Sequence, residues 1–314
     1  MLLSESSKIK RILVTTNKGL FGRTLSGFIL NPGFSRDEIL FFDGYIDSEL
    51  DSNPFEEFIQ SFRPEIIIHN AVKLPRGDDI HNWSLKERNL KVFELILDAA
   101  EKFMVQNVLA FTSYHVFSKA LQAPFKLNEL NLESTGLESW YSSYKIEEIR
   151  LASAHNQKKR VTKVNFIMLP HMFGVYDNYD EGKRHFVADV IVRISEAKSL
   201  HQSNVTFKGD GRQKLQLASS ESLVSFVLDD YLKRMATADF IEVFNRGACA
   251  SLSDVTNFVA DALNYQGRVI FDIAADKRHA RNMYFRESNT LVEILEFHTS
   301  LKKVVDEYTL ATTN

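Results

Sequence analysis

Short apolar runs alternate with amphipathic segments along the first half of the chain. The apolar runs have the length and aliphatic composition of buried strands, and they occupy residues 11–15, 38–42, 65–69, 107–112 and 161–168. The segments between them read as helices, at residues 22–30, 54–62, 83–103 and around Tyr141. Strands that alternate with helices predict an α/β protein with a mostly parallel sheet covered on both faces.

The pattern changes after about residue 175. Residues 177–184 are polar and typical of a loop, and the later elements lose the regular alternation. We therefore expect a dinucleotide-binding domain at residues 1–175. Residues 176–314 should form a smaller, partly discontinuous region that completes a substrate cleft and returns segments to the first domain.

Composition narrows the function classes. The chain has 314 residues, 44% hydrophobic and 25% charged, enough to bury a sizeable core. A formal net charge of −3 gives no support for a nucleic-acid or anionic-membrane partner. No apolar stretch reaches spanning length, and residues 1–10 lack the apolar core of a signal peptide. The single cysteine, Cys249, makes no internal disulfide or cysteine-rich metal site, so we expect a cytoplasmic protein without a metal.

Residues 15–22 join the first predicted strand to the first predicted helix. A dinucleotide fold needs a tight turn here, so that backbone N–H groups and the helix N-terminus approach the pyrophosphate. Gly19 and Gly22 have the spacing of two of the three usual glycines, whereas Thr16 stands at the first position. In isolation, an ordinary βα turn explains the segment about equally well.

Two residues bear on the choice of cofactor. Asp43 follows the second predicted strand, where an acid can bind the ribose hydroxyls of NAD, although a turn residue is the alternative. Lys18 lies in the glycine loop and favours NADP, because a cation there can pair with the 2′-phosphate.

A serine, a tyrosine and a lysine have the spacing of an acid–base site. Tyr141 and Lys145 are four residues apart, so they share one face of a helix. Free tyrosine titrates near pH 10, so we expect the Lys145 charge to lower the pKa of Tyr141. Ser113 ends an apolar run 28 residues before Tyr141 and would bind the substrate oxygen. An amphipathic helix with an exposed lysine is the alternative.

With these motifs the chain resembles the extended short-chain dehydrogenase/reductase (NAD-dependent epimerase/dehydratase) family, and within it the GDP-L-fucose synthase group. The segments that carry the resemblance are 64–73, 111–117, 173–179 and 265–272, the last matching a late strand. The resemblance implies a Rossmann-type doubly wound parallel sheet with a smaller C-terminal substrate-binding region.

The activity implied is hydride transfer between a nicotinamide and C4 of a nucleotide-diphosphate 4-keto-6-deoxy sugar. The implied cofactor is NADP(H), with NAD(H) as the alternative, and the implied partners are a GDP-linked sugar and a second copy of the chain. C3/C5 epimerase activity stays open. So do two other functions: an NAD-dependent nucleotide-sugar epimerase or dehydratase, and a non-catalytic binding or regulatory relative.

The resemblance also assigns roles residue by residue. Tyr141 would donate the proton, Ser113 would bind the oxyanion, and Lys145 would bind the nicotinamide ribose. His185 matches an acid–base histidine, and His115 takes the position of a catalytic cysteine. The implied cofactor-binding residues are Thr16, Lys18, Gly19, Leu20, Phe21, Gly22, Asp43, Asp51, Ala71 and Lys145. The implied substrate-binding residues are His171, Asn178, Arg193, Lys214 and Arg281.

The chain departs from the family pattern at several of these positions. His171 replaces an asparagine, and Leu215 replaces an arginine expected at the diphosphate, with Lys214 beside it. His115 is bulkier than a thiol, which favours simple 4-keto reduction over double epimerisation.

Family members commonly dimerise through the tyrosine helix and the helix before it. Here the helix at 90–97 would supply that face together with Ile146, Ile149 and Leu151, although burial against the sheet uses the same residue types.

Overall fold

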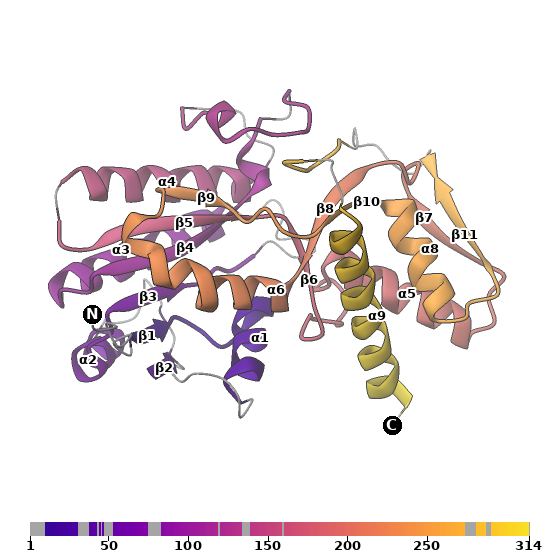
Figure 1. The fold of residues 1–314 in the computed structure, drawn as a ribbon, viewed down its shortest axis with the longest axis horizontal. Helices are drawn as coiled ribbons and strands as arrows, with labels where there is room; N and C mark the ends of the chain where they lie inside the picture. The colour runs from indigo at the N-terminus through magenta and orange to yellow at the C-terminus, as the bar shows by residue number, and fades with distance from the viewer. Residues whose placement is uncertain are drawn as a thin grey trace, which may run out of the picture. The chain divides into compact units, whose positions relative to one another are not determined.

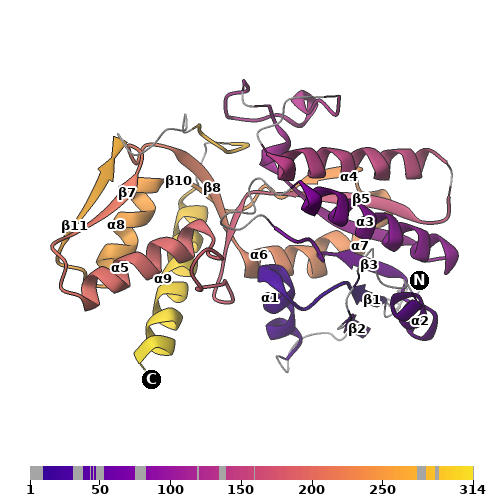
Figure 2. The same ribbon diagram turned by 180° about the vertical axis from the view of Figure 1, so that it is seen from behind.

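The protein is described by a computed structural model that covers residues 10–30, 38–42, 44, 46, 53–74, 83–118, 120–133, 139–158, 160–273, 281–286 and 290–313. The chain folds into two units. The first comprises residues 1–116, 132–168 and 234–242, and the second comprises residues 117–131, 169–233 and 243–314. Figures 1 and 2 show the elements of each unit from two opposite sides.

The first unit is built on a six-stranded sheet of order β2-β1-β3-β4-β5-β9. Its strands are β1 (Arg11–Val14), β2 (Glu38–Phe41), β3 (Ile66–His69), β4 (Asn107–Ser113), β5 (Lys163–Leu169) and β9 (Ile241–Val243). The pairs β1–β2, β1–β3 and β3–β4 are parallel. The chain adds β2 on one side of β1 and β3 on the other, so the strand order reverses there. In open α/β sheets, ligands bind at the carboxyl ends of strands beside such a reversal.

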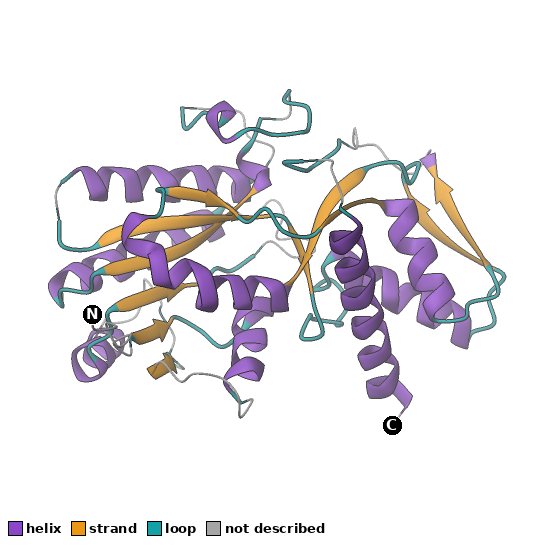
Figure 3. Ribbon diagram, in the orientation of Figure 1, coloured by secondary structure: helices purple, strands orange, loops and turns teal. Residues whose placement is uncertain are grey.

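Four helices of the first unit connect these strands: α1 (Gly19–Ile29), α2 (Asn53–Phe62), α3 (Ser84–Lys102) and α4 (Trp140–Gln157). A short 3₁₀ turn, η2 (Tyr114–Val116), follows β4. Helices α3 and α4 pack side by side, as Figure 3 shows. The predicted α/β class with a parallel, Rossmann-type sheet is thereby confirmed.

The strands form because three successive aliphatic residues are buried in each central one. Ile12, Leu13 and Val14 of β1 are fully buried. Residues 66–68 of β3 are equally inaccessible, which places both faces of the sheet under helices. Removing this much apolar surface from water is the main stabilising contribution to the unit.

Helix α4 faces the core with residues that we had expected at a dimer interface. Ile146 and Ile149 are 1% and 0% exposed within the single chain, so that expectation is wrong for both. Both side chains lie on the side of α4 that faces the sheet. Burying an aliphatic side chain in the core of its own chain stabilises the protein as much as burying it against a partner chain does. Leu151 is half-buried.

The second unit contains two small sheets. The three-stranded sheet has the order β10-β8-β6, and the two-stranded sheet pairs β11 with β7 in parallel. Their strands are β6 (His171–Phe173), β7 (Asn204–Lys208), β8 (Lys214–Ser219), β10 (Ala248–Ser251) and β11 (Arg268–Asp272). β11 confirms the late strand predicted within 265–272, and residues 177–184 form the predicted loop.

Helices and helical turns complete this unit. They are η3 (Leu127–Glu129), α5 (Phe186–Ser199), α6 (Ser220–Ser225), a π-helical turn η4 (Phe226–Tyr231), α7 (Leu232–Arg234), α8 (Leu252–Ala262) and α9 (Leu291–Thr313), while η5 (Met235–Thr237) belongs to the first unit. Among the described helices, none combines the length and the apolar character needed to cross a membrane.

Candidate active site

The loop between β1 and α1 has the geometry of a phosphate-binding turn. Helix α1 begins at Gly19, three residues earlier than predicted, and Gly19 has a φ of +75° with open space where a Cβ would stand. The Thr16 hydroxyl accepts a hydrogen bond from the Lys18 N–H at 3.1 Å and closes the turn. A Cβ on Gly22 would lie 2.7 Å from the Thr16 carbonyl oxygen, so only glycine fits there.

The start of α1 fits an anionic group. No side chain caps the helix at Lys18 and no acidic residue lies in the first turn, so the first backbone N–H groups can serve an anion. Leu20 and Phe21 are buried, and Phe21 packs against Phe111 with ring centroids 4.8 Å apart. These two residues can therefore reach a cofactor only through their backbone, and threonine at the first glycine position does not block the turn.

A hydrogen-bonded group joins the carboxyl ends of β1 and β3. The Thr15 hydroxyl accepts bonds from the N–H groups of Asn70 and Ala71, each at 3.0 Å. The Asn70 amide donates in turn to the Thr16 carbonyl at 3.0 Å. These bonds fix the loop relative to the end of β3. Asn70 was not among the predicted site residues, although a polar residue directly after a buried strand is a signal for a role at the site.

The segment that follows Ala71 is hydrogen-bonded to α3. Asn89, buried in α3, accepts a bond from the Lys73 N–H and donates to the Lys73 carbonyl, at 3.0 and 2.9 Å. The chain after Ala71 is thus held against the helix. Asp43 and Asp51, the two acids expected near the cofactor, lie outside the described residues.

Ser113, His115 and Tyr141 come together in the first unit. Ser113 is the last residue of β4, and its hydroxyl is hydrogen-bonded to that of Tyr141. Tyr141 lies in the first turn of α4, where Ser139 caps the helix by accepting a bond from the Ser142 N–H at 3.2 Å. The His115 ring meets the Tyr141 ring edge-on, with centroids 6.2 Å apart.

Lys145 does not act on Tyr141 as expected. Its ammonium donates to the Phe111 carbonyl and to Oε2 of Glu148, both at 2.7 Å. Burial, and next the Glu148 charge, raise the pKa of Tyr141, and the Ser113 hydrogen bond opposes them only in part. The expectation that Lys145 lowers this pKa is therefore wrong for the protein without ligands, because a carboxylate has already paired with the cation.

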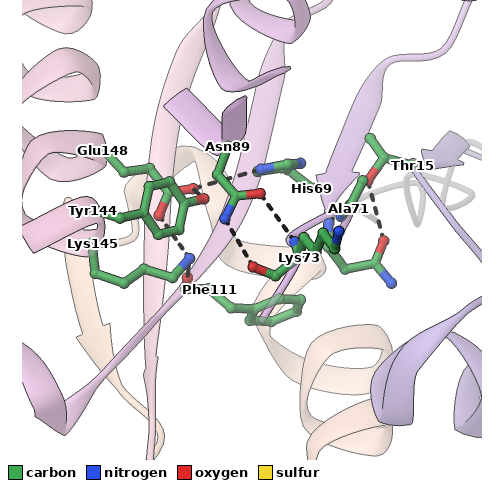
Figure 4. A network of polar contacts seen from close by, with 10 residues as sticks. Thr15, His69, Ala71, Lys73, Asn89, Phe111, Tyr144, Lys145 and Glu148 are labelled. Carbon is green, nitrogen blue, oxygen red and sulfur yellow. Dashed lines mark hydrogen bonds and ion pairs between the residues drawn. The ribbon is translucent and has the colours of Figure 1, made fainter. Parts of the chain in front are cut away.

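The same carboxylate organises a buried polar network (Figure 4). Oε1 of Glu148 accepts the Tyr144 hydroxyl at 2.7 Å and lies 3.6 Å from Nε2 of His69. Burial, and next the charge of Lys145, lower the pKa of His69 to about 3, so its ring is neutral. Burial and Glu148 raise the pKa of Tyr144. Glu148 was not among the predicted site residues, although its distance of three residues from Lys145 and four from Tyr144 places all three on one helix face.

In the second unit, His185 is held by a buried acid. Its Nδ1 lies 2.6 Å from Oδ1 of Asp177, which is 5% exposed, and the histidine ring is partly open to solvent. The same oxygen accepts the Asn178 N–H at 2.7 Å. A carboxylate at Nδ1 fixes the ring orientation and leaves Nε2 for chemistry. Asp177, too, was not among the predicted site residues.

The expected substrate-binding residues are all in the second unit. The Arg193 guanidinium lies over the Phe207 ring at 4.4 Å and donates to the Thr206 carbonyl. Arg281 donates to the carbonyls of Phe117 and Ser118, at 3.1 and 2.5 Å. Both cations are thus held by groups of their own unit. The other three are His171 at the start of β6, Asn178 in the loop before α5, and Lys214 at the start of β8.

Comparison with known proteins is consistent with this geometry. The model of the NAD dependent epimerase/dehydratase family matches residues 12–229, more than half of the chain. GDP-L-fucose synthase of Dictyostelium discoideum is 20% identical over 97% of this chain and 96% of its own length. GDP-L-fucose synthase of Escherichia coli K12 is 22% identical over 84% of each chain. A structure of a GDP-L-fucose synthetase from Naegleria fowleri bound to NADP superposes with a TM-score of 0.76 at 17% identity, covering 97% of this chain and 94% of that one.

Proposed function

Because the chain belongs to the NAD-dependent epimerase/dehydratase family, we propose that it reduces the 4-keto group of a GDP-linked 4-keto-6-deoxy sugar, with NADPH as the hydride donor. Family membership makes it an NAD(P)-dependent oxidoreductase/epimerase of the extended short-chain dehydrogenase/reductase type. The observation that carries the proposal is the hydrogen-bonded hydroxyl pair of Ser113 and Tyr141 at the end of β4.

The residues of the first unit perform the chemistry as follows. When bound, NADPH would supply the hydride that reduces the carbonyl carbon. The Tyr141 hydroxyl gives its proton to the oxygen that becomes negative, and the Ser113 hydroxyl holds that oxygen by a hydrogen bond. His115, in ring contact with Tyr141, shapes the space beside them.

The cofactor is assigned to the loop at 15–22. The first N–H groups of α1 would bind the pyrophosphate, and Thr16, Gly19 and Gly22 keep the turn tight. NADP(H) is favoured over NAD(H) because the related Naegleria protein was solved with NADP and because Lys18 is exposed beside this turn. The segment beginning at Ala71 would border the cofactor.

The substrate is assigned mainly to residues 176–314, with the dinucleotide assigned to residues 1–175. We expect Asn178, Arg193, Lys214 and Arg281 to contact the nucleotide sugar, together with His171. The names of the related proteins support a GDP-linked substrate. We also place the protein in the cytoplasm as a homodimer, formed through the outer faces of α3 and α4; light scattering that shows a monomer at micromolar concentration would contradict the dimer.

The test replaces the proposed proton donor. Tyr141→Phe should lower turnover of GDP-4-keto-6-deoxymannose by about 10²–10⁴-fold, since only the proton donor is lost. NADPH affinity, measured by calorimetry, should change by less than about twofold. Tyr308→Phe, a hydroxyl removed from α9, is the matched control. Full turnover in Tyr141→Phe would remove the catalytic role of the pair.

Epimerisation at C3 and C5 is the second candidate, favoured by one observation. The buried Asp177 orients His185, as a base that exchanges protons beside a carbonyl requires. We expect simple reduction, because His115 fills the position of a smaller thiol. Incubation in deuterated water without NADPH decides the matter: deuterium at C3 or C5 that disappears in His185→Gln would establish the epimerase.

A further inference from the structure

A charged carboxylate lies inside the first unit on the same helix face as the proposed proton donor. Tyr141, Lys145 and Glu148 follow one another at intervals of four and three residues along α4. Glu148 is 0% exposed and Lys145 is 4% exposed. Burying two charges costs several kcal/mol per ion unless they are paired and hydrogen-bonded, so this pair needs all of its contacts.

Each charge in this pair is accounted for by close contacts. Oε2 of Glu148 takes the Lys145 ammonium at 2.7 Å, and Oε1 takes the Tyr144 hydroxyl at 2.7 Å. The Phe111 carbonyl accepts a second ammonium proton at 2.7 Å. Two of the three ammonium donors are therefore used, and the positive charge has its counter-ion in contact (Figure 4).

A paired cation acts on a nearby phenol differently from a lone one. An isolated ammonium would stabilise a phenolate strongly in a poorly solvated site. With Glu148 in contact, the two charges largely cancel at Tyr141. The direction of the Tyr141 pKa agrees, since burial and then Glu148 raise it.

The groups on the elements around Tyr141 do not supply a positive charge in place of the one on Lys145 that Glu148 cancels. β3 presents His69, which is neutral because its pKa falls to about 3. η2 presents His115, in ring contact with Tyr141, and Tyr144 stands beside it on α4. α3 packs Leu85 and Leu90 into the same cluster, while its Lys86 donates to the Ser143 hydroxyl at 2.9 Å.

We propose that Glu148 is a positioning residue that neutralises Lys145 and so keeps Tyr141 in its proton-donating form, the form from which carbonyl reduction starts. The inference rests on the proposed function in that Tyr141 must be the donor. In reduction, the Tyr141 proton passes to the oxygen of the reduced carbonyl, and the phenolate left behind regains a proton from water. In the oxidising direction the tyrosine must start as a phenolate, and Glu148 opposes that state.

The first measurement needs neither cofactor nor substrate. Phenolate absorbance is followed during an alkaline titration of the ligand-free protein, and the signal of Tyr141 is isolated by subtracting the Tyr141→Phe variant of each background. In the parent, the Tyr141 phenolate should appear only at strongly alkaline pH, because burial and next Glu148 raise its pKa. In Glu148→Gln, the Tyr141 phenolate should appear at a pH lower by about one unit or more, because Lys145 has lost its counter-ion.

Glu147→Gln is the matched control. Glu147 is the neighbouring acid on the outer face of α4 and pairs with Arg150 at 3.0 Å. This variant should titrate as the parent does. A Tyr141 signal in Glu148→Gln that coincides with those of the parent and of Glu147→Gln would overturn the proposal.

A second variant keeps the test usable if Glu148→Gln does not fold, because removing one partner of a buried ion pair destabilises a protein strongly. Glu148→Asp keeps the charge but draws the carboxylate back by about 1.5 Å, one carbon–carbon bond. Its Tyr141 phenolate should appear at a lower pH than in the parent. An unchanged Glu148→Asp titration would likewise refute the role of Glu148.

Turnover separates this proposal from the proposed function. In Glu148→Gln, carbonyl reduction should lose rate at alkaline pH values at which the parent is still fully active, because Tyr141 loses its proton sooner, while Glu147→Gln keeps the pH profile of the parent. If the parent reduces the GDP sugar and neither the pH profile nor the titration moves in Glu148→Gln, Glu148 has no such role. If the titration moves but the parent reduces no GDP-linked 4-keto sugar, the proposed function is refuted.

Discussion

Replacing His69 by glutamine should reduce the loss of stability that accompanies acidification from pH 7 to pH 5. His69 is 1% exposed, and burial together with the Lys145 charge lowers its pKa from 6.5 to about 3. The native ring is therefore neutral at both pH values, whereas the unfolded chain takes up a proton near pH 6.5. The unfolded state binds more protons, so stability falls as the pH drops below 6.5 and continues to fall until about pH 3.

The magnitude between pH 7 and 5 depends only on the unfolded pKa, because the native ring titrates below this range. Proton binding to the unfolded ring stabilises that state by about 1.9 kcal/mol over the interval. Urea unfolding at the two pH values measures the difference. The parent should lose about 1.9 kcal/mol more than His69→Gln. His201→Gln, which removes an exposed histidine after α5, should follow the parent.

Equal losses in the parent and in His69→Gln would refute this reasoning. They would show that native His69 accepts a proton, which Oε1 of Glu148 at 3.6 Å is placed to stabilise. At acidic pH Glu148 would then form an ion pair with protonated His69, and its pairing with Lys145 would be weaker than the geometry indicates. The measurement therefore also examines the electrostatic basis of the proposed role of Glu148.

Three further changes have defined outcomes. Gly22→Ala should weaken NADPH binding at least about tenfold in calorimetry, because the new Cβ meets the Thr16 carbonyl at 2.7 Å; unchanged affinity would mean that the turn does not hold the cofactor. Asp177→Asn should reduce any His185-dependent deuterium exchange about tenfold without affecting NADPH affinity, and equal exchange would show that His185 needs no carboxylate. Phe93→Ala, at a residue 0% exposed that stacks on His69, should cost about 3–5 kcal/mol in urea unfolding, and a loss below about 1 kcal/mol would contradict its place in the core.

Local patterns were sufficient for most of the first unit's elements. Runs such as Ile12-Leu13-Val14 predicted β1 because three successive aliphatic residues can be hidden only in a strand covered on both faces. The start of α1 was missed by three residues. Gly19 and the two apolar residues after it read as loop, whereas the φ of +75° at Gly19 lets the helix begin there.

For the candidate site, the sequence determined which groups lie near one another along the chain. The spacing of Tyr141 and Lys145 fixes them on one helix face, whatever the rest of the protein does. It also places Glu148 on that face, but spacing is the same for a solvated acid and for a buried one. Only the tertiary structure decides which it is.

Burial and partners from distant segments then set the chemistry. Glu148 becomes the counter-ion of Lys145 because α4 packs against the sheet, where β3 brings His69 and β4 brings the Phe111 carbonyl. Charge interactions grow as water is excluded, so the sign of the effect on Tyr141 could not be read from the motif. The sequence determined the proton donor that we propose, and the tertiary structure decided in which state that donor is held.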